Sequence, residues 1–298
     1  MKQLLFQGAA TALVTPMKKD GSLDLDALAA LTKRQIQGGI AALVPCGTTG
    51  EAATLTAQEH FAVIRTVAEV SAGRVPVIAG AGCNDTARAE QLCRSAQKAG
   101  ADALLLVTPY YNKCTPKGLQ RHFMRLASSC DLPVILYNVP SRTGVTIDME
   151  SRQTLAKVES IIGLKEAGTD FSLISQHLLE LKDDLPLYSG NDDLTLALMA
   201  MGAVGCISVL GNILPHSMQS LCDDVLRGNI SEARTLHNAL LPLMKSLFCE
   251  VNPIPVKAAM PLIGIPCGGC RMPLSQMEPE HFAVLKARFM AAKDAGLC

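Results

Sequence analysis

Short apolar runs recur along the chain, and each one ends in small or polar residues before an amphipathic stretch begins. The runs are almost continuously apolar rather than alternating, which is typical of strands in a parallel sheet that is covered on both faces. The pattern predicts eight strands, within residues 9–16, 40–47, 75–82, 103–111, 133–140, 161–166, 185–191 and 203–209.

Helix signals lie between these runs. Thr56 and Glu59 have the spacing of a capping box. Other candidate helix caps are Asp24 or Asp26, Thr86, Asp148, Thr169-Asp170 and Asn191-Asp192. Eight strand–helix units predict an α/β fold, a (β/α)8 or TIM barrel, over residues 1–228. The alternative, an open dinucleotide-binding sheet, loses its best support because no GxGxxG follows the first strand.

The strand pattern stops near residue 228. Residues 230–248, 253–264 and 279–296 instead have the pattern of helices. Since a barrel needs about 250 residues, we expect residues 229–298 to form a C-terminal three-helix extension. It would pack on the side of the barrel or on a neighbouring subunit.

Two stretches could be mistaken for export or membrane signals. Residues 1–16 loosely resemble a signal peptide, but Gln7-Gly8 interrupts the apolar part, so a first strand is the better interpretation. Residues 194–222 contain no Asp, Glu, Lys or Arg, yet glycines and Pro215 divide the run. We therefore expect part of a soluble core and no membrane partner.

Composition narrows the function classes. The chain of 298 residues has no net formal charge and only 4% aromatic residues, which argues against nucleic acid and favours small-molecule partners. Its eleven cysteines are scattered and odd in number, so we expect reduced thiols in the cytoplasm. Cys267-Gly-Gly-Cys270 has no second pair or histidine pair to complete a zinc site, and no metal site is predicted.

In a barrel of this kind the active site lies at the C-terminal ends of the strands. The predicted strands end in hydroxyls, phenols and one amine that would share a rim. The residues there are Thr48-Thr49-Gly50-Glu51, Tyr110-Tyr111-Asn112, Tyr137-Asn138, Lys165, Gly190-Asn191 and Ile207-Ser208.

Lys165 ends the apolar run IIGLKE, where a charge is costly to bury. The simpler interpretation is a side chain that extends to solvent at the rim. Between phenols, however, desolvation would lower the pKa of the amine and allow it to attack a carbonyl. The pattern favours a Schiff-base lysine.

The other strand ends fit such a lysine. Thr48-Thr49-Gly50-Glu51 could be a capping box, or a turn whose hydroxyls and backbone N–H groups bind a small carboxylate. Tyr111 and Tyr137 could be core aromatics or proton-transfer groups. Arg142 could be a surface arginine or the partner of a second carboxylate.

Five motifs carry a family resemblance: GTTGEAATL, VTPYYNK, YNVPSRTGV, GLKEAG and SGND. In this order and spacing they resemble the dihydrodipicolinate synthase and N-acetylneuraminate lyase superfamily of pyruvate-dependent aldolases, over essentially the whole chain. The paired threonines and Arg142 resemble its dihydrodipicolinate synthase branch. That implies condensation of pyruvate with L-aspartate 4-semialdehyde, on the route to diaminopimelate and lysine.

The resemblance also implies roles for individual residues. Lys165 would form the imine with pyruvate, and Tyr137 would transfer protons through Thr48 and Tyr111. Thr48 and Thr49 would bind the pyruvate carboxylate, and Arg142 the carboxylate of the semialdehyde. Gly190 and Ile207 would shape the site through their carbonyls. No metal or organic cofactor is implied, because the protonated imine is the electron sink.

Family members are commonly homotetramers, in which the phenol matching Tyr111 enters a neighbouring active site. Lysine-inhibited relatives use a histidine and a glutamate to bind lysine at the dimer interface, where this chain has Ala57 and Arg88. Although Asn84, His60 and Tyr110 match that site, Arg88 would repel an ammonium group, so we expect weak or absent lysine feedback. A second departure is Cys114, where the motif usually has proline.

Two other functions stay open at this point. A sister aldolase, such as N-acetylneuraminate lyase or a 2-keto-3-deoxy sugar acid aldolase, would share the lysine chemistry, but a sugar offers no carboxylate to Arg142. A catalytically silent barrel would show gaps among Lys165, Tyr137, Thr48, Thr49 and Tyr111, and none is present.

Overall fold

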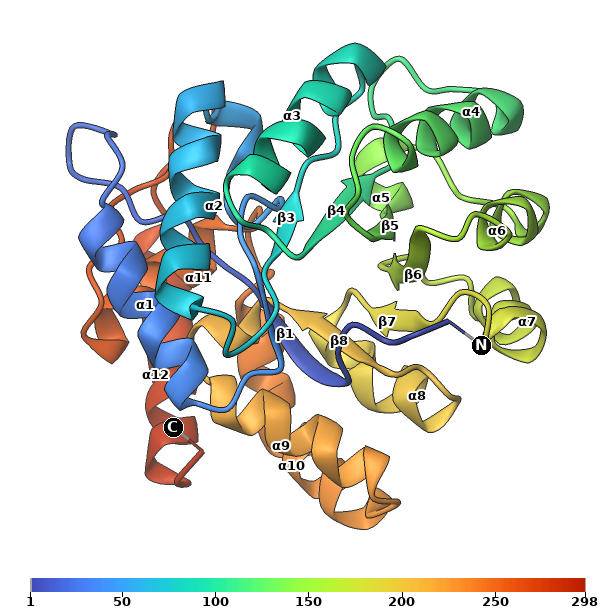
Figure 1. The fold of residues 1–298 in the computed structure, drawn as a ribbon. Coiled ribbons are helices and arrows are strands. Elements are labelled where there is room, and N and C mark those ends of the chain that lie inside the picture. The colour runs from blue at the N-terminus through green and yellow to red at the C-terminus, as the bar shows by residue number, and fades with distance from the viewer. Residues whose placement is uncertain (1, 298) are drawn as a thin grey trace.

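The fold is described from a computed structural model that covers residues 2–297. Its eight strands form one parallel sheet in the order β2-β1-β8-β7-β6-β5-β4-β3. A parallel bridge between Leu43 and Val77 joins β2 to β3 and closes the sheet into a barrel (Figure 1). The strands are β1 (Gly8–Ala12), β2 (Ala42–Val44), β3 (Ile78–Gly80), β4 (Ala103–Val107), β5 (Val134–Asn138), β6 (Ile161–Glu166), β7 (Leu187–Ser189) and β8 (Gly205–Ser208).

Helices surround the barrel and alternate with its strands, as Figure 1 shows. The barrel portion contains α1 (Leu25–Gln37), α2 (Ala57–Ser71), α3 (Thr86–Lys98), α4 (Pro116–Ala127), α5 (Pro140–Thr143), α6 (Met149–Ala156), α7 (Phe171–Leu181), α8 (Thr195–Ala200) and α9 (Pro215–Leu226). Short 3₁₀ turns are η1 (Ala52–Thr54), η2 (Asp192–Leu194), η3 (Leu210–Asn212) and η4 (Met260–Ile263). The predicted TIM barrel is confirmed, and all eight predicted apolar runs contain a strand.

Most predicted helix starts are confirmed. Thr56 and Glu59 form a complete capping box at α2, and the carboxylates of Asp24, Asp148 and Asp170 accept N–H bonds at α1, α6 and α7. The prediction of Thr86 as the cap of α3 is wrong by one residue, since the cap is Asp85. Asp85 accepts the first N–H bonds of α3, because its carboxylate reaches both Ala87 and Arg88, while the Thr86 hydroxyl pairs with His122.

Two hydrophobic clusters divide the interior. The larger lies between strands and helices, and the smaller fills the barrel with side chains such as Ala10, Ile135, Tyr137 and Ile207. Successive side chains along each strand point alternately into the barrel and toward the helices, which separates the two clusters. Lys165 is the register partner of Tyr137 across β5 and β6, so both side chains lie on the barrel side of the sheet.

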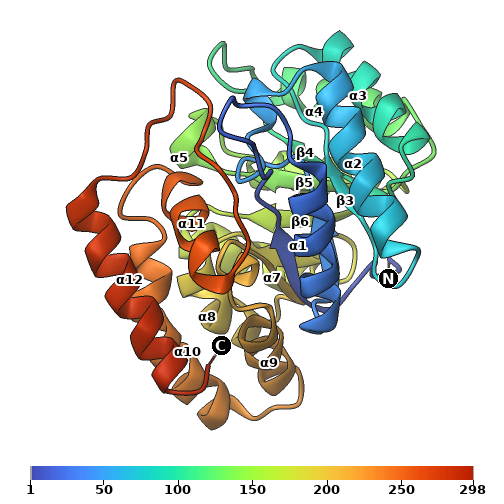
Figure 2. The same cartoon turned by 90° about the vertical axis from the view of Figure 1, so that its left-hand side faces the viewer.

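The tail forms α10 (Ile230–Ser246), α11 (Ile254–Ala259) and α12 (Pro279–Asp294), which confirms three helices beyond the barrel. Figure 2 shows α10 and α12 side by side, and α10 also packs on α9. Leu240, Leu285 and Phe289 belong to the same hydrophobic cluster as the barrel helices. The division of the chain at residue 228 into two domains stays a prediction.

The apolar run 194–222 is divided, as expected, into α8, β8, η3 and α9. Within residues 2–297, no helix combines the length and the apolarity that crossing a membrane requires.

Candidate active site

Lys165 lies at the C-terminal end of β6 and is only 6% exposed. Burial lowers the pKa of its amine to about 8, partly opposed by the negative charge of Asp192. The Nζ atom lies 4.4 Å from the centroid of the Tyr137 ring. A lysine in this state has an appreciable neutral fraction near neutral pH, so the amine can act as a nucleophile.

Tyr137 lies on β5 with its phenol buried beside the lysine. Burial raises the pKa of this phenol, while the positive charge of Arg142 and a hydrogen bond with Thr48 lower it. The phenol therefore stays protonated near neutral pH and can both donate and accept protons in step with the Thr48 hydroxyl. The structure brings together Lys165, Tyr137 and Thr48.

The turn after β2, residues 47–51, is tightly wound. Its backbone is held by hydrogen bonds from Gly50 N to Gly47 O (3.1 Å) and from Glu51 N to Thr48 O (3.1 Å). Within residues 2–297, the backbone N–H groups of Thr48 and Thr49 donate to no protein acceptor. Free N–H groups beside hydroxyls are suited to a small carboxylate.

The capping-box alternative for this turn is wrong. Glu51 precedes η1 with a left-handed backbone (φ 54°), and its side chain makes no cap hydrogen bond. Instead its carboxylate accepts from Lys257 Nζ at 2.6 Å and from the backbone N–H of Arg271 at 2.9 Å. A buried ion pair with the tail replaces the local cap.

Arg142 lies in the last turn of α5 and is exposed. Its charge nevertheless lowers the pKa values of Tyr137 and Lys165, so the guanidinium lies near the buried amine. An exposed guanidinium near the buried amine is suited to pair with the carboxylate of a substrate.

Gly190 directly follows β7, and Ile207 is the last residue but one of β8, on the same rim. The Gly190 N–H donates to Glu166 O at 2.7 Å, and a Cβ at this position would lie 2.8 Å from the Cβ of Ala167. Gly190 thus permits a close approach of two strand ends beside the lysine. Ile207 is buried inside the barrel.

Tyr111 is the predicted site residue that a single chain does not bring to this group. It is 91% exposed, has a left-handed backbone (φ 72°), and its hydroxyl has no hydrogen-bond partner within residues 2–297. The predicted relay from Tyr137 through Thr48 to Tyr111 is therefore not assembled within one copy of the chain.

Sequence reasoning missed several buried polar residues around the site. Asp192, considered only as a helix cap, accepts N–H bonds from Val209 (3.1 Å) and Leu210 (2.8 Å) and supplies negative charge near the lysine. Glu166, next to Lys165, is ion-paired with the fully buried Arg152. Strand-end position could have suggested Glu166, but no local pattern points to the role of Asp192.

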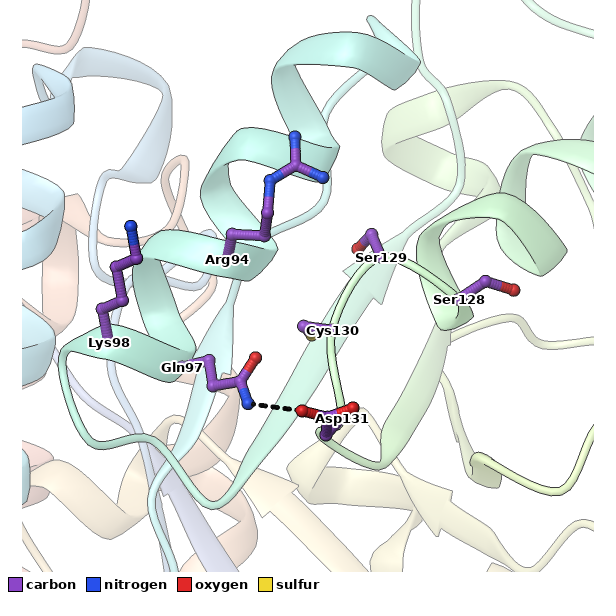
Figure 3. A pocket seen from close by; sticks show the side chains of 7 residues that line it. All are labelled: Arg94, Gln97, Lys98, Ser128, Ser129, Cys130 and Asp131. Carbon is purple, nitrogen blue, oxygen red and sulfur yellow. Dashed lines mark hydrogen bonds between the residues drawn. The ribbon is translucent and has the colours of Figure 1, made fainter.

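A cavity of about 470 Å³ lies elsewhere on the molecule, between α3 and the segment after α4. Figure 3 shows the hydrogen bond from Gln97 to Asp131 in it, and it contains none of the predicted site residues. This cavity adjoins the C-terminal ends of α3 and α4. Because these helices run antiparallel to the strands, it lies on the barrel face opposite Lys165.

Comparisons with known proteins show the family of the chain. A model of the dihydrodipicolinate synthetase family matches residues 5–292. The 4-hydroxy-tetrahydrodipicolinate synthase of Acetivibrio thermocellus is 45% identical over 297 residues, with 100% of both chains covered.

Two solved structures illustrate the likeness of fold. The chloride-inhibited dihydrodipicolinate synthase from Acinetobacter baumannii, complexed with pyruvate, has 41% identity and a TM-score of 0.93, covering 98% of this chain and 99% of that one. The enzyme from Cyanidioschyzon merolae with lysine bound has 36% identity and a TM-score of 0.95, covering 99% of this chain and 100% of that one. The chain belongs to the dihydrodipicolinate synthetase family.

Proposed function

We propose that the chain is a 4-hydroxy-tetrahydrodipicolinate synthase, a lyase that condenses pyruvate with L-aspartate 4-semialdehyde. The observation that carries this proposal is the buried amine of Lys165, with its pKa lowered to about 8, held against the Tyr137 ring. Membership of the family and full-length relatives with this name support the choice of reaction.

The first half of the reaction forms a nucleophile. Neutral Lys165 attacks C2 of pyruvate, and the carbinolamine loses water to give a protonated imine. Loss of a proton from C3 then gives an enamine, with the imine nitrogen accepting the electron pair. In this proposal Tyr137, whose buried phenol lies beside Lys165 and Thr48, carries these protons.

The second half joins the two substrates. C3 of the enamine attacks the aldehyde carbon of the semialdehyde, and the aldehyde oxygen takes up a proton to become a hydroxyl. The amino group of the semialdehyde then displaces Lys165 from the imine carbon, which closes the ring and frees the lysine. The electron sink is the imine itself.

The remaining predicted residues have binding roles in this proposal. Thr48 and Thr49 bind the pyruvate carboxylate through the free N–H groups and hydroxyls of their turn. Arg142 binds the carboxylate of the semialdehyde at the mouth of the site. Gly190 and Ile207 shape the site through their backbone carbonyls.

The proposed assembly is a homotetramer in which Tyr111 completes the active site of a neighbouring copy. Its 91% exposure in a single chain leaves the phenol available for such a contact. Tyr111 lies in the loop between β4 and α4, and its backbone is left-handed.

Lysine feedback is proposed to be weak or absent. Burial lowers the pKa of His60 and raises that of Tyr110, and the charge of Arg88 acts on both groups by lowering their pKa values. His60 and Tyr110 are two of the three residues that match the effector site of inhibited relatives. A cationic effector would meet that charge. Inhibition by micromolar lysine in a steady-state titration would contradict this expectation.

The function is tested by pyruvate consumption with three acceptors: L-aspartate 4-semialdehyde, N-acetylmannosamine and a simple aldose. Lys165→Ala is the blank. We expect turnover only with the semialdehyde and none in the variant. Turnover confined to a sugar would retain the lysine chemistry but overturn the assigned substrate.

A further inference from the structure

The C-terminal tail reaches into the turn that is proposed to bind pyruvate. Nδ2 of Asn252 donates to the Thr49 hydroxyl at 3.0 Å, across 203 positions of sequence. Both side chains are buried. The tail thus contacts a proposed substrate-binding hydroxyl directly.

This contact determines which way the Thr49 hydroxyl faces. A hydroxyl has one hydrogen to donate and lone pairs that accept. Because the oxygen accepts from Asn252, its hydrogen points elsewhere, and within residues 2–297 it has no protein acceptor. The hydroxyl is left as a donor, which is what a substrate carboxylate requires.

A second set of contacts from the tail holds Glu51, the last residue of the turn. Nζ of Lys257 lies 2.6 Å from Glu51 Oε1 and 2.7 Å from the carbonyl oxygen of Gly269. Arg271 donates its backbone N–H to the other oxygen of Glu51 at 2.9 Å. Glu51 and Lys257 are both buried, so the pair is screened little by solvent.

We propose that Asn252, together with the Lys257–Glu51 pair, positions the 47–51 turn so that the Thr49 hydroxyl donates to the carboxylate of the 2-keto acid. These are positioning residues: they act through Thr49 and Glu51 and need not touch the substrate. The proposal rests on the proposed function and adds that the tail sets affinity for the first substrate. A preorganised donor does not have to be oriented during binding, which lowers the cost of binding.

Asn252→Ala tests the proposal through the two Michaelis constants. We expect KM for pyruvate to rise about tenfold, as the loss of one oriented hydrogen bond predicts, with KM for the semialdehyde changed less than twofold. Gln120→Ala is the matched control. It removes an amide-to-hydroxyl bond of 3.1 Å, to Ser151, between α4 and α6 and should leave both constants unchanged.

Asn252→Asp is the sharper variant because it reverses the hydrogen bond. An aspartate accepts the Thr49 hydrogen and turns the donor away from the substrate, so KM for pyruvate should rise more than in Asn252→Ala. If Asn252→Asp instead bound pyruvate as tightly as the wild type, the Thr49 hydrogen would point to residue 252 and the proposal would be wrong.

A double-mutant cycle with Thr49→Val separates positioning from general damage. In the Thr49→Val background, Asn252→Ala should leave KM for pyruvate unchanged, because the hydroxyl that it orients is gone. Equal effects in both backgrounds would contradict action through Thr49.

The ion pair is tested by the double variant Glu51→Gln with Lys257→Met, which removes both charges and avoids a lone buried charge. An unchanged KM for pyruvate in this folded double variant would exclude the pair from the proposal.

Borohydride trapping of pyruvate by the wild-type protein distinguishes failure of the proposed function from failure of the positioning role alone. Without trapping, the proposed function itself fails. With trapping but no change in KM among the Asn252 variants, only the positioning role fails.

Discussion

Lys165 and Tyr137 are register partners on adjacent parallel strands, and the lysine Nζ lies 4.4 Å from the centroid of the tyrosine ring. Two rigid strands therefore hold the amine and the phenol in fixed relation inside the barrel. The proposed nucleophile and the proposed proton-transfer group would therefore be held close together at one reacting centre.

The lowered pKa of Lys165 gives a defined pH dependence. Burial brings the pKa from 10.5 to about 8, so the reactive neutral amine is lost as the pH falls through 8. At subsaturating pyruvate, the rate of imine formation should fall about tenfold per pH unit below this midpoint. Rapid-mixing measurements between pH 6 and 9.5 test this, and a midpoint near 10.5 would show that burial does not shift the amine.

The lowered pKa of Lys165 should also reduce the free energy of unfolding of the protein. Folding with a charged Lys165 is opposed below pH 8 by about 3 kcal/mol, from a pKa lowered by 10.5 minus about 8 at ~1.36 kcal/mol per unit. The penalty disappears as the pH rises through 10.5. Lys165→Met should therefore raise the melting temperature at pH 7 and give a smaller rise at pH 10.

The matched control for stability is Lys182→Met, which replaces a lysine at the exposed end of α7. It should shift the melting temperature little at either pH. A Lys165→Met variant less stable than the wild type at pH 7 would contradict the assigned cost of burial.

Arg142 should distinguish the two substrates. Arg142→Ala should raise KM for the semialdehyde at least tenfold, since it removes a charged hydrogen-bond partner (~1.5–3 kcal/mol). Because the Arg142 charge lowers the pKa of Lys165, the pH midpoint of imine formation should also move upward in this variant. Arg142→Lys should restore part of the affinity for the semialdehyde, because lysine keeps the positive charge but cannot make two parallel hydrogen bonds to a carboxylate.

The opposite pattern would count against this assignment. If Arg142→Ala raised KM for pyruvate and left that of the semialdehyde unchanged, the guanidinium would bind the first substrate. Steady-state kinetics with each substrate varied in turn separates these outcomes.

Tyr111 can be tested by mixing two inactive variants. If its phenol acts in a neighbouring site, a Tyr111→Phe copy paired with a Lys165→Ala copy contains one complete site, formed by the lysine of the first and the phenol of the second. Co-refolded mixtures should regain activity that neither variant has alone. No recovery in oligomers proven to be mixed would place Tyr111 outside the partner's site.

Patterns local in sequence predicted much of the molecule. Continuous apolar runs identified every strand, because both faces of each strand are covered, and carboxylates such as Asp24 and Asp170 identified helix starts. The capping-box interpretation of Glu51 failed because its partner, Lys257, lies 206 positions away. A local motif contains no information about such a distant charge.

Some residues of the candidate site could likewise be predicted from local patterns, and others could not. Lys165 and Tyr137 meet because they pair across the neighbouring strands β5 and β6. Thr48 follows β2, which is not a neighbour of either strand, and it reaches Tyr137 because the C-terminal ends of all barrel strands share one rim. Asn252 and Asp192 could not be found by that rule. Asn252 comes from the tail, and Asp192 depends on backbone N–H groups of a different strand end.

The most direct measurement is borohydride reduction in the presence of pyruvate, followed by peptide mapping by mass spectrometry. The proposed chemistry predicts one stable adduct of pyruvate, on Lys165, formed by the wild type and absent from Lys165→Arg. An adduct on another lysine, or none at all in protein that consumes pyruvate, would contradict the Schiff-base mechanism.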